Sequence, residues 1–269
     1  MGCGASAQRE NDVPITRVVP LPQAVSEANT LTLTGGSQEL GNGGISQYSK
    51  ASLDKVNSLT DRASPEQVLQ ALLDGNARFI SGASVHPHQD FSRVKQISVK
   101  QKPLAAILGC ADSRVPAEIV FDQGFGDVFV CRVAGNIATP EQVASLEYAV
   151  LHVGVKVVMI LGHTKCGAVH AALSGKAFPG FIDTLVGNLD VAIARVDSVS
   201  AKAHQRLLDS EEERQEKVVR ENVKYQIQRC QRSTIIQEGL QRGKVLLAGA
   251  VYDLDTGRVH VIVTKGGTR

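Results

Sequence analysis

The stretch that decides the fold reads LAAILGCADSR over residues 104–114. It opens with an apolar run, Leu104–Leu108, and turns polar after Gly109. An apolar run this short, with no polar face, is typical of a strand buried on both sides in a parallel sheet. We therefore expect Cys110 at the carboxyl end of a central strand.

Further strands and helices alternate along the chain from this point. Strands are expected at Val128–Arg132 and Val155–Leu161, and the second runs into GHTKCG at residues 162–167. Thr139-Pro140 is a helix start between them, and Gly167 opens the next helix. This alternation predicts an α/β fold with a mostly parallel central sheet flanked by helices. Ligands of such sheets gather beyond the carboxyl ends of strands, so Cys110 and His163 are expected to meet.

The two ends of the chain differ in character. Ser64, followed by Pro at the first helical position and Gln at the third, predicts a helix start and a folded domain over residues 64–269. Residues 1–63 are rich in breakers and predict an acylation signal followed by a flexible Gly/Ser-rich arm. Two long amphipathic helices are expected, from Asp183 to about Val199 and from Glu211 to about Leu240. A terminal hairpin should join residues 245–252 to 259–263.

Composition excludes several classes of protein. A net charge of +2 without a Lys/Arg cluster argues against nucleic-acid binding. No apolar run approaches the roughly 20 residues of a membrane span. The five cysteines are an odd number, which favours metal-bound and packed thiols in a reducing, intracellular compartment over a disulfide framework. Cys131 and Cys230 are expected to be packed as small apolar groups.

The first six residues, MGCGAS, match the N-myristoylation pattern. Gly2 would carry the myristoyl group, and the neighbouring Cys3 could take palmitate. Two acyl chains make a stable membrane anchor where one does not. We therefore expect an intracellular, membrane-associated protein; with an unmodified N-terminus the protein would be cytoplasmic.

Cys110, His163 and Cys166 are residues of the types that bind zinc. Three protein ligands with a fourth position left for water is the pattern of a catalytic Zn²⁺ site. Arg114 could hold the Asp112 carboxylate by paired hydrogen bonds, so that Asp112 accepts a hydrogen bond from zinc-bound hydroxide and orients it. Released from Arg114, Asp112 could instead become the fourth ligand of a closed state.

Several motifs together resemble the β-class carbonic anhydrases, from about Ser64 to Val263. These are CADSRV at 110–115, RVAGN at 132–136, EYAV at 147–150 and GHTKCG at 162–167, with NARF at 76–79 on the first helix. The resemblance implies a zinc lyase that hydrates CO₂ reversibly to bicarbonate and a proton by attack of zinc-bound hydroxide. It implies Cys110, His163 and Cys166 as zinc ligands.

The resemblance also implies a catalytic dyad, a substrate pocket and an assembly. Asp112 and Arg114 would be the dyad. Gln101 and Tyr148 would line the pocket across a dimer interface, Phe129 would form an apolar wall, and the Gly167 N–H would hold a bicarbonate oxygen. The protein would be a homodimer or homotetramer, with its N-terminal helical arm embracing a neighbour.

The sequence also departs from the family and leaves alternatives open. It has no Trp, which puts an inhibitory bicarbonate site built with Trp in doubt, and Ala134 stands where plant-like members have Val. The same site could act on CS₂ or COS. A membrane-tethered scaffold or bicarbonate sensor with structural zinc would require Asp112 as a permanent ligand. A cysteine phosphatase is excluded because no Gly-rich loop lies between Cys110 and Arg114.

Overall fold

The computed structural model describes residues 62–202 and 210–267. The acylation signal at Gly2 and Cys3 and almost all of the N-terminal arm lie outside these residues, so those expectations and the division of the chain at residue 64 stay predictions. Within the described residues, no helix is both long enough and apolar enough to cross a membrane.

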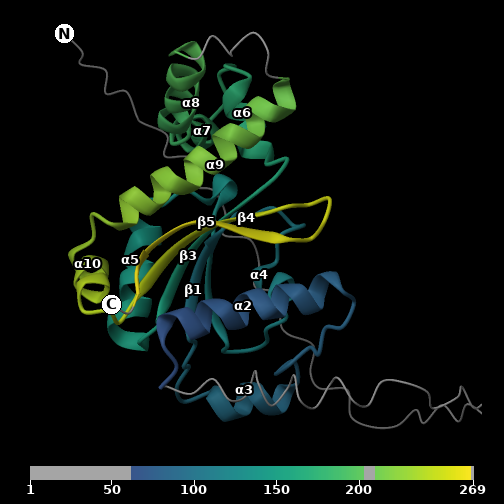
Figure 1. Ribbon diagram of the computed structural model, residues 1–269, viewed down its shortest axis with the longest axis vertical. Coiled ribbons are helices and arrows are strands. Elements are labelled where there is room, and N and C mark those ends of the chain that lie inside the picture. Colours follow the sequence, from purple (N-terminus) through teal and green to yellow (C-terminus); the bar gives the residue numbers. More distant parts are fainter. Residues whose placement is uncertain (1–61, 203–209, 268–269) are drawn as a thin grey trace, which may run out of the picture. The chain divides into compact units, whose positions relative to one another are not determined.

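A five-stranded sheet in the order β2-β1-β3-β4-β5 forms the centre of the fold (Figure 1). The first four strands are parallel and β5 pairs antiparallel with β4. The predicted mostly parallel sheet and the terminal hairpin are both confirmed. The strands are β1 (Ala105–Gly109), β2 (Val128–Arg132), β3 (Val157–His163), β4 (Leu246–Tyr252) and β5 (Val259–Gly266).

Strands β1, β3 and β4 are buried along their whole length. Alternate residues face opposite sides of the sheet. Ile107 and Met159 lie in one core cluster, together with residues of α2 and α4. Leu108 and Ile160 lie in the other, together with residues of α5 and α9. Both faces are covered by helices, which is why these strands are continuous apolar runs.

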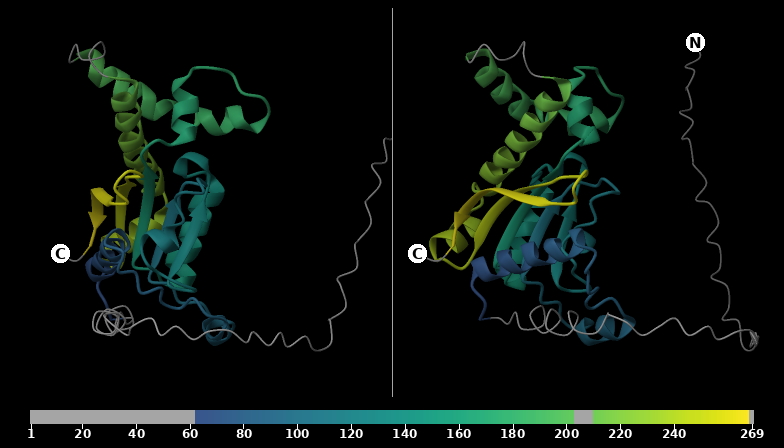
Figure 2. Two further views of the ribbon diagram at one scale, coloured as in Figure 1. Left: turned by 90° about the vertical axis from the view of Figure 1, so that its right-hand side faces the viewer. Right: turned by 45° about the vertical axis from the view of Figure 1, so that its right-hand side comes forward.

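The helix that opens the fold, α2 (Pro65–Ile80), begins as the sequence predicts, with a capping box at Ser64. Helices α6, α7 and α8 gather beyond the carboxyl end of β3 (Figure 2). Helix α5 ends in the π-helical turn η2. The remaining helices are α3 (Phe91–Ile97), α4 (Ala117–Val120), the 3₁₀ turn η1 (Ala134–Asn136), α5 (Pro140–Tyr148), η2 (Ala149–Val153), α6 (Gly167–Leu173), α7 (Phe181–Gly187), α8 (Asp190–Lys202), α9 (Glu211–Cys230) and α10 (Thr234–Gln241).

The prediction of two long helices was wrong, because each is broken once. The first is α7 followed by α8, and the Asn188 amide at the break donates to the Thr184 carbonyl. The second is α9 followed by α10, and the Ser233 hydroxyl caps α10 by accepting from the Ile236 N–H. Apolar periodicity continues through both breaks, so local polar caps decided the boundaries.

The register of β1 and β3 sets the position of the site. Gly109, the last residue of β1, pairs with Leu161, and β3 extends two residues further. Cys110 therefore leaves the sheet beside the end of β3, where His163 is the last strand residue.

Asn76 on α2 ties together three segments that are distant in sequence. Its amide nitrogen donates to the Val120 carbonyl at 3.1 Å and to the Gly257 carbonyl at 2.9 Å. Its amide oxygen accepts from the Val259 N–H at 2.9 Å. The side chain is buried, so the loss of the amide leaves backbone groups without partners.

We expect Asn76→Ala to lower the free energy of unfolding by roughly 3 kcal/mol, because buried unpaired polar groups cost about 1–3 kcal/mol each. Urea denaturation at a fixed protein concentration measures the change. Gln70→Ala, an exposed change on the same helix, is the control and should stay within about 0.5 kcal/mol of the wild type. Equal stability of the two variants would contradict the role given to Asn76.

Candidate metal centre

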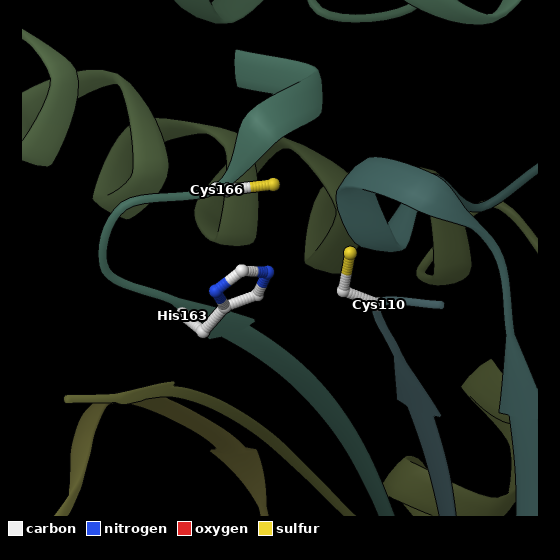
Figure 3. A group of neighbouring side chains, drawn as sticks. All are labelled: Cys110, His163 and Cys166. Atoms are coloured by element: carbon white, nitrogen blue, oxygen red, sulfur yellow. The ribbon is translucent and has the colours of Figure 1, made fainter. Parts of the chain in front are cut away.

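Cys110, His163 and Cys166 converge at the carboxyl edge of the sheet (Figure 3). One potential ligand atom from each lies within 4.8 Å of the other two, and all three residues are buried. They come from the end of β1, the end of β3 and the N-cap of α6. The structure thus brings together the three residues that the sequence predicts as metal ligands.

The turn between His163 and Cys166 is held by the terminal hairpin. The Thr164 N–H donates to the Tyr252 carbonyl at 3.0 Å, and the Thr164 hydroxyl accepts from the Leu254 N–H at 2.9 Å. Lys165 takes a positive φ of 55° between the two ligands, and the Cys166 sulfur extends into the space that the His163 ring and the Cys110 sulfur also face (Figure 3). The chain reversal and the hairpin together fix two of the three ligands.

The His163 ring is oriented for metal binding. Its Nδ1 lies 2.8 Å from the Thr164 carbonyl oxygen. A carbonyl only accepts, so Nδ1 carries the proton and Nε2 has a free lone pair. Nε2 is buried and has no hydrogen-bond partner among the described residues. A buried lone pair facing two sulfurs is what a metal ligand requires, and a backbone carbonyl on the other ring nitrogen is its usual support.

The two thiols affect each other's protonation. A hydrogen bond with Cys166 is the main cause that lowers the pKa of Cys110 to about 4. The same contact, followed by burial, raises the pKa of Cys166. The Gly135 N–H also donates to the Cys110 sulfur at 3.3 Å. Two sulfurs with one imidazole nitrogen are a donor set that suits Zn²⁺.

Asp112 and Arg114 form the predicted pair. Arg114 Nε donates to Asp112 Oδ1 at 2.9 Å, and Arg114 Nη2 donates to Oδ2 at 2.7 Å. This two-pronged hydrogen bond is the main reason that the pKa of Asp112 lies well below its ordinary value. Asp112 Oδ2 is 3.9 Å from His163 Nε2, so an ionised carboxylate stands beside the centre.

The residues predicted to line the substrate pocket lie at different distances from the metal centre of their own chain. Gly167 follows Cys166 and begins α6. The rings of Phe129 and Tyr148 are 6.5 Å apart, and Tyr148 is 51% exposed. Gln101 is exposed and precedes β1, whereas Cys110 follows it. A five-residue strand spans about 17 Å, so Gln101 lies away from the metal centre of its own chain.

Residues that we did not single out from the sequence support the centre from outside. Arg132 donates to the Cys110 carbonyl at 2.9 Å and to the Asp112 carbonyl at 2.6 Å. Gln215 on α9 donates to the Cys166 carbonyl at 3.0 Å. Arg132 and Gly135 both lie in the RVAGN motif, but the motif alone does not show which atoms they contact.

The two remaining described cysteines are packed, as predicted. Cys131 lies in β2 and Cys230 at the end of α9, and both are buried. Burial raises the pKa of both thiols, that of Cys230 to about 12. Neither belongs to the metal-ligand group found among the described residues.

Comparisons with known proteins agree on one family. The family described as carbonic anhydrase matches residues 105–259. A carbonic anhydrase of Mycolicibacterium smegmatis is 39% identical over 203 residues, which cover 74% of this chain and 94% of that protein. Carbonic anhydrase 2 of Mycobacterium tuberculosis is 38% identical over 200 residues, which cover 72% and 91%.

Solved structures of the β-class are similar as well. A tetrameric β-carbonic anhydrase of Sordaria macrospora has a TM-score of 0.58 and 28% identity, covering 75% of this chain and all of that one. The Coccomyxa β-carbonic anhydrase, solved in complex with acetazolamide, has a TM-score of 0.57 and 29% identity, covering 74% of this chain and 88% of that one.

Proposed function

The chain belongs to the β-class carbonic anhydrases, and we propose that it hydrates CO₂ reversibly to bicarbonate and a proton at the Cys110, His163 and Cys166 centre. The observation that carries the proposal is the buried lone pair of His163 Nε2, which faces two cysteine sulfurs beside an ionised Asp112. We propose Zn²⁺ as the metal. Zinc in such a site acts as a Lewis acid and lowers the pKa of a coordinated water from about 15.7 to roughly 7.

Asp112 is proposed to orient the attacking oxygen. An ionised carboxylate can only accept hydrogen bonds, so it fixes the direction of the oxygen's O–H and leaves a lone pair for CO₂. Arg114 keeps Asp112 ionised and holds both of its oxygens. If that ion pair opened, the carboxylate could turn to the fourth ligand position and close the site.

A structural metal site is less well supported by the same geometry. It would require a fourth permanent protein ligand. Asp112 is the nearby candidate, and both of its oxygens are bound by Arg114 instead. A position left for solvent favours catalysis.

The substrate pocket is proposed to need a second copy of the chain. Phe129 and Tyr148 would provide an apolar surface for CO₂, and the Gly167 N–H would bind a bicarbonate oxygen. Gln101 would reach the pocket from the partner, since it lies off the opposite end of β1 from Cys110 in its own chain. We propose a homodimer or homotetramer; the similar Sordaria enzyme is tetrameric.

The test is a CO₂-hydration assay combined with zinc analysis of purified variants. Asp112→Asn should retain zinc and lose about 100-fold in kcat, because it removes a positioned acceptor without removing a ligand. Cys110→Ser should lose zinc and activity together. Asp255→Asn is the matched control. Asp255 forms an exposed ion pair with Lys165, which lies between the ligands His163 and Cys166. Wild-type hydration by Asp112→Asn would contradict its role, and a zinc-loaded wild type without hydration would contradict the function.

We also propose that Gly2 is myristoylated and Cys3 palmitoylated, and that the two acyl chains attach the protein to a membrane. The support is the MGCGAS sequence and the greater stability of a two-chain anchor. Both residues lie outside the described structure.

On expression in eukaryotic cells, we expect mass spectrometry of the N-terminal peptide to show both groups. Gly2→Ala should move the protein from the membrane fraction to the soluble fraction. Cys3→Ser should weaken membrane binding while leaving the myristoyl group in place. An unmodified Gly2 would refute the proposal.

A further inference from the structure

We infer that Asn222 and Gln226 on α9 are positioning residues of the metal centre, which hold the loop over residues 133–138 so that the Gly135 N–H meets the Cys110 sulfur. The inference rests on the proposed zinc site. It assigns a role in metal binding to two amides that neither bind the metal nor line the substrate pocket.

A continuous chain of hydrogen bonds connects these amides to the ligand. Gln226 Nε2 donates to Asn222 Oδ1 at 2.7 Å, and Asn222 Nδ2 donates to the Gly135 carbonyl at 2.9 Å. Gln226 Oε1 accepts from the Ala138 N–H at 2.9 Å. The Gly135 N–H in turn donates to Cys110 Sγ at 3.3 Å. The loop is held at two points, and the peptide of one of them contacts the thiolate.

The loop turns through two consecutive left-handed residues. Gly135 has a φ of 73° and Asn136 a φ of 45°. Glycine and asparagine adopt this region with little strain, so the turn can form locally. The helical turn η1 is only three residues long, so the position of the loop depends on what it packs against. The two amides of α9 are hydrogen-bond partners that fix this position.

The burial of the amides argues against a role in packing alone. Asn222 is 1% exposed and Gln226 is fully buried. Apolar side chains of similar size would fill this space without the desolvation cost of an amide. Among the described residues, the hydrogen bonds of the two amide side chains join them to each other or to the loop, so these amides hold the loop in place.

Helix α9 is placed closely enough to act on the centre. A Cβ on Gly162, the residue before His163, would lie 2.7 Å from Val223 Cγ2, so α9 and the end of β3 are in direct contact. Gln215, seven positions before Asn222, donates to the Cys166 carbonyl at 3.0 Å. Positions 215, 222 and 226 share one face of the helix. One face of α9 therefore contacts the turn that carries Cys166 and the loop whose Gly135 N–H meets the Cys110 sulfur.

The hydrogen bond from Gly135 affects both the position of the Cys110 sulfur and its strength as a metal ligand. A hydrogen bond to a thiolate lowers the energy of the sulfur lone pairs and weakens sulfur-to-metal donation. Partners of this outer kind typically change metal affinity by 10–100-fold. Without the amides, the Gly135 N–H would no longer be aimed at Cys110, and the sulfur would donate more strongly from a less fixed position. We expect the loss of a fixed ligand position to outweigh the stronger donation, so that zinc affinity falls.

The test uses the full chain loaded with cobalt(II), whose sulfur-to-metal charge-transfer band reports on the thiolates. Asn222→Leu and Gln226→Met remove the amides with little change of volume. We expect this band to move to longer wavelength in both variants, and chelator competition to show about 10-fold weaker zinc binding. Ile227→Ala, a buried apolar change on the same helix, is the control for lost stability. It should unfold more easily but keep the wild-type band and zinc affinity.

The possible results separate the inference about Asn222 and Gln226 from the proposed function. A band and zinc affinity unchanged from wild type in either amide variant that folds, or the same changes in Ile227→Ala, would overturn the inference. If neither amide variant folds, a milder change, Asn222→Ser, which keeps a short polar side chain, is measured in the same way. A wild-type protein that takes up neither cobalt nor zinc would instead overturn the proposed function.

Discussion

Two cysteine sulfurs and one histidine nitrogen within 4.8 Å of one another, all buried, form the constraint on which the rest of the structure depends. Burying a thiolate in an apolar core is costly unless an opposite charge or hydrogen bonds compensate it. The Gly135 N–H compensates in part, and a divalent cation would compensate the charge of both sulfurs. The strands, helices and loops around the site keep these three atoms together.

Four parts of the fold do this from different directions. The parallel register of β1 and β3 places Cys110 beside His163. The terminal hairpin binds the turn at Thr164. Helix α9 contacts the Cys166 turn and the Gly135 loop, and the guanidinium of Arg132 binds the carbonyls of Cys110 and Asp112. Stability and function are therefore coupled at this edge of the sheet: changes in α9 or in the hairpin act on the ligands without touching them.

The sequence was most informative where one local interaction determines the outcome. The central strands were predictable because residues buried on both faces must be apolar, and the Asp112–Arg114 pair because two residues in a turn can reach each other. The breaks at Asn188 and Ser233 were missed because apolar periodicity runs through them. Gln101 could be assigned only by its offset from Cys110, and a sequence offset does not show that the two residues leave opposite ends of a strand. Asn222 and Gln226 look like the solvated face of an amphipathic helix, although their spacing from Gln215 by seven and eleven positions was a visible signal.

X-ray absorption at the zinc edge of the purified protein tests the central claim most directly. The account predicts one zinc per chain with two sulfurs at about 2.3 Å, one imidazole nitrogen at about 2.0–2.1 Å and one oxygen at about 2.0–2.2 Å. A shell of four sulfur and nitrogen ligands without oxygen, or a folded protein that retains no zinc after equilibration with it, would contradict the account.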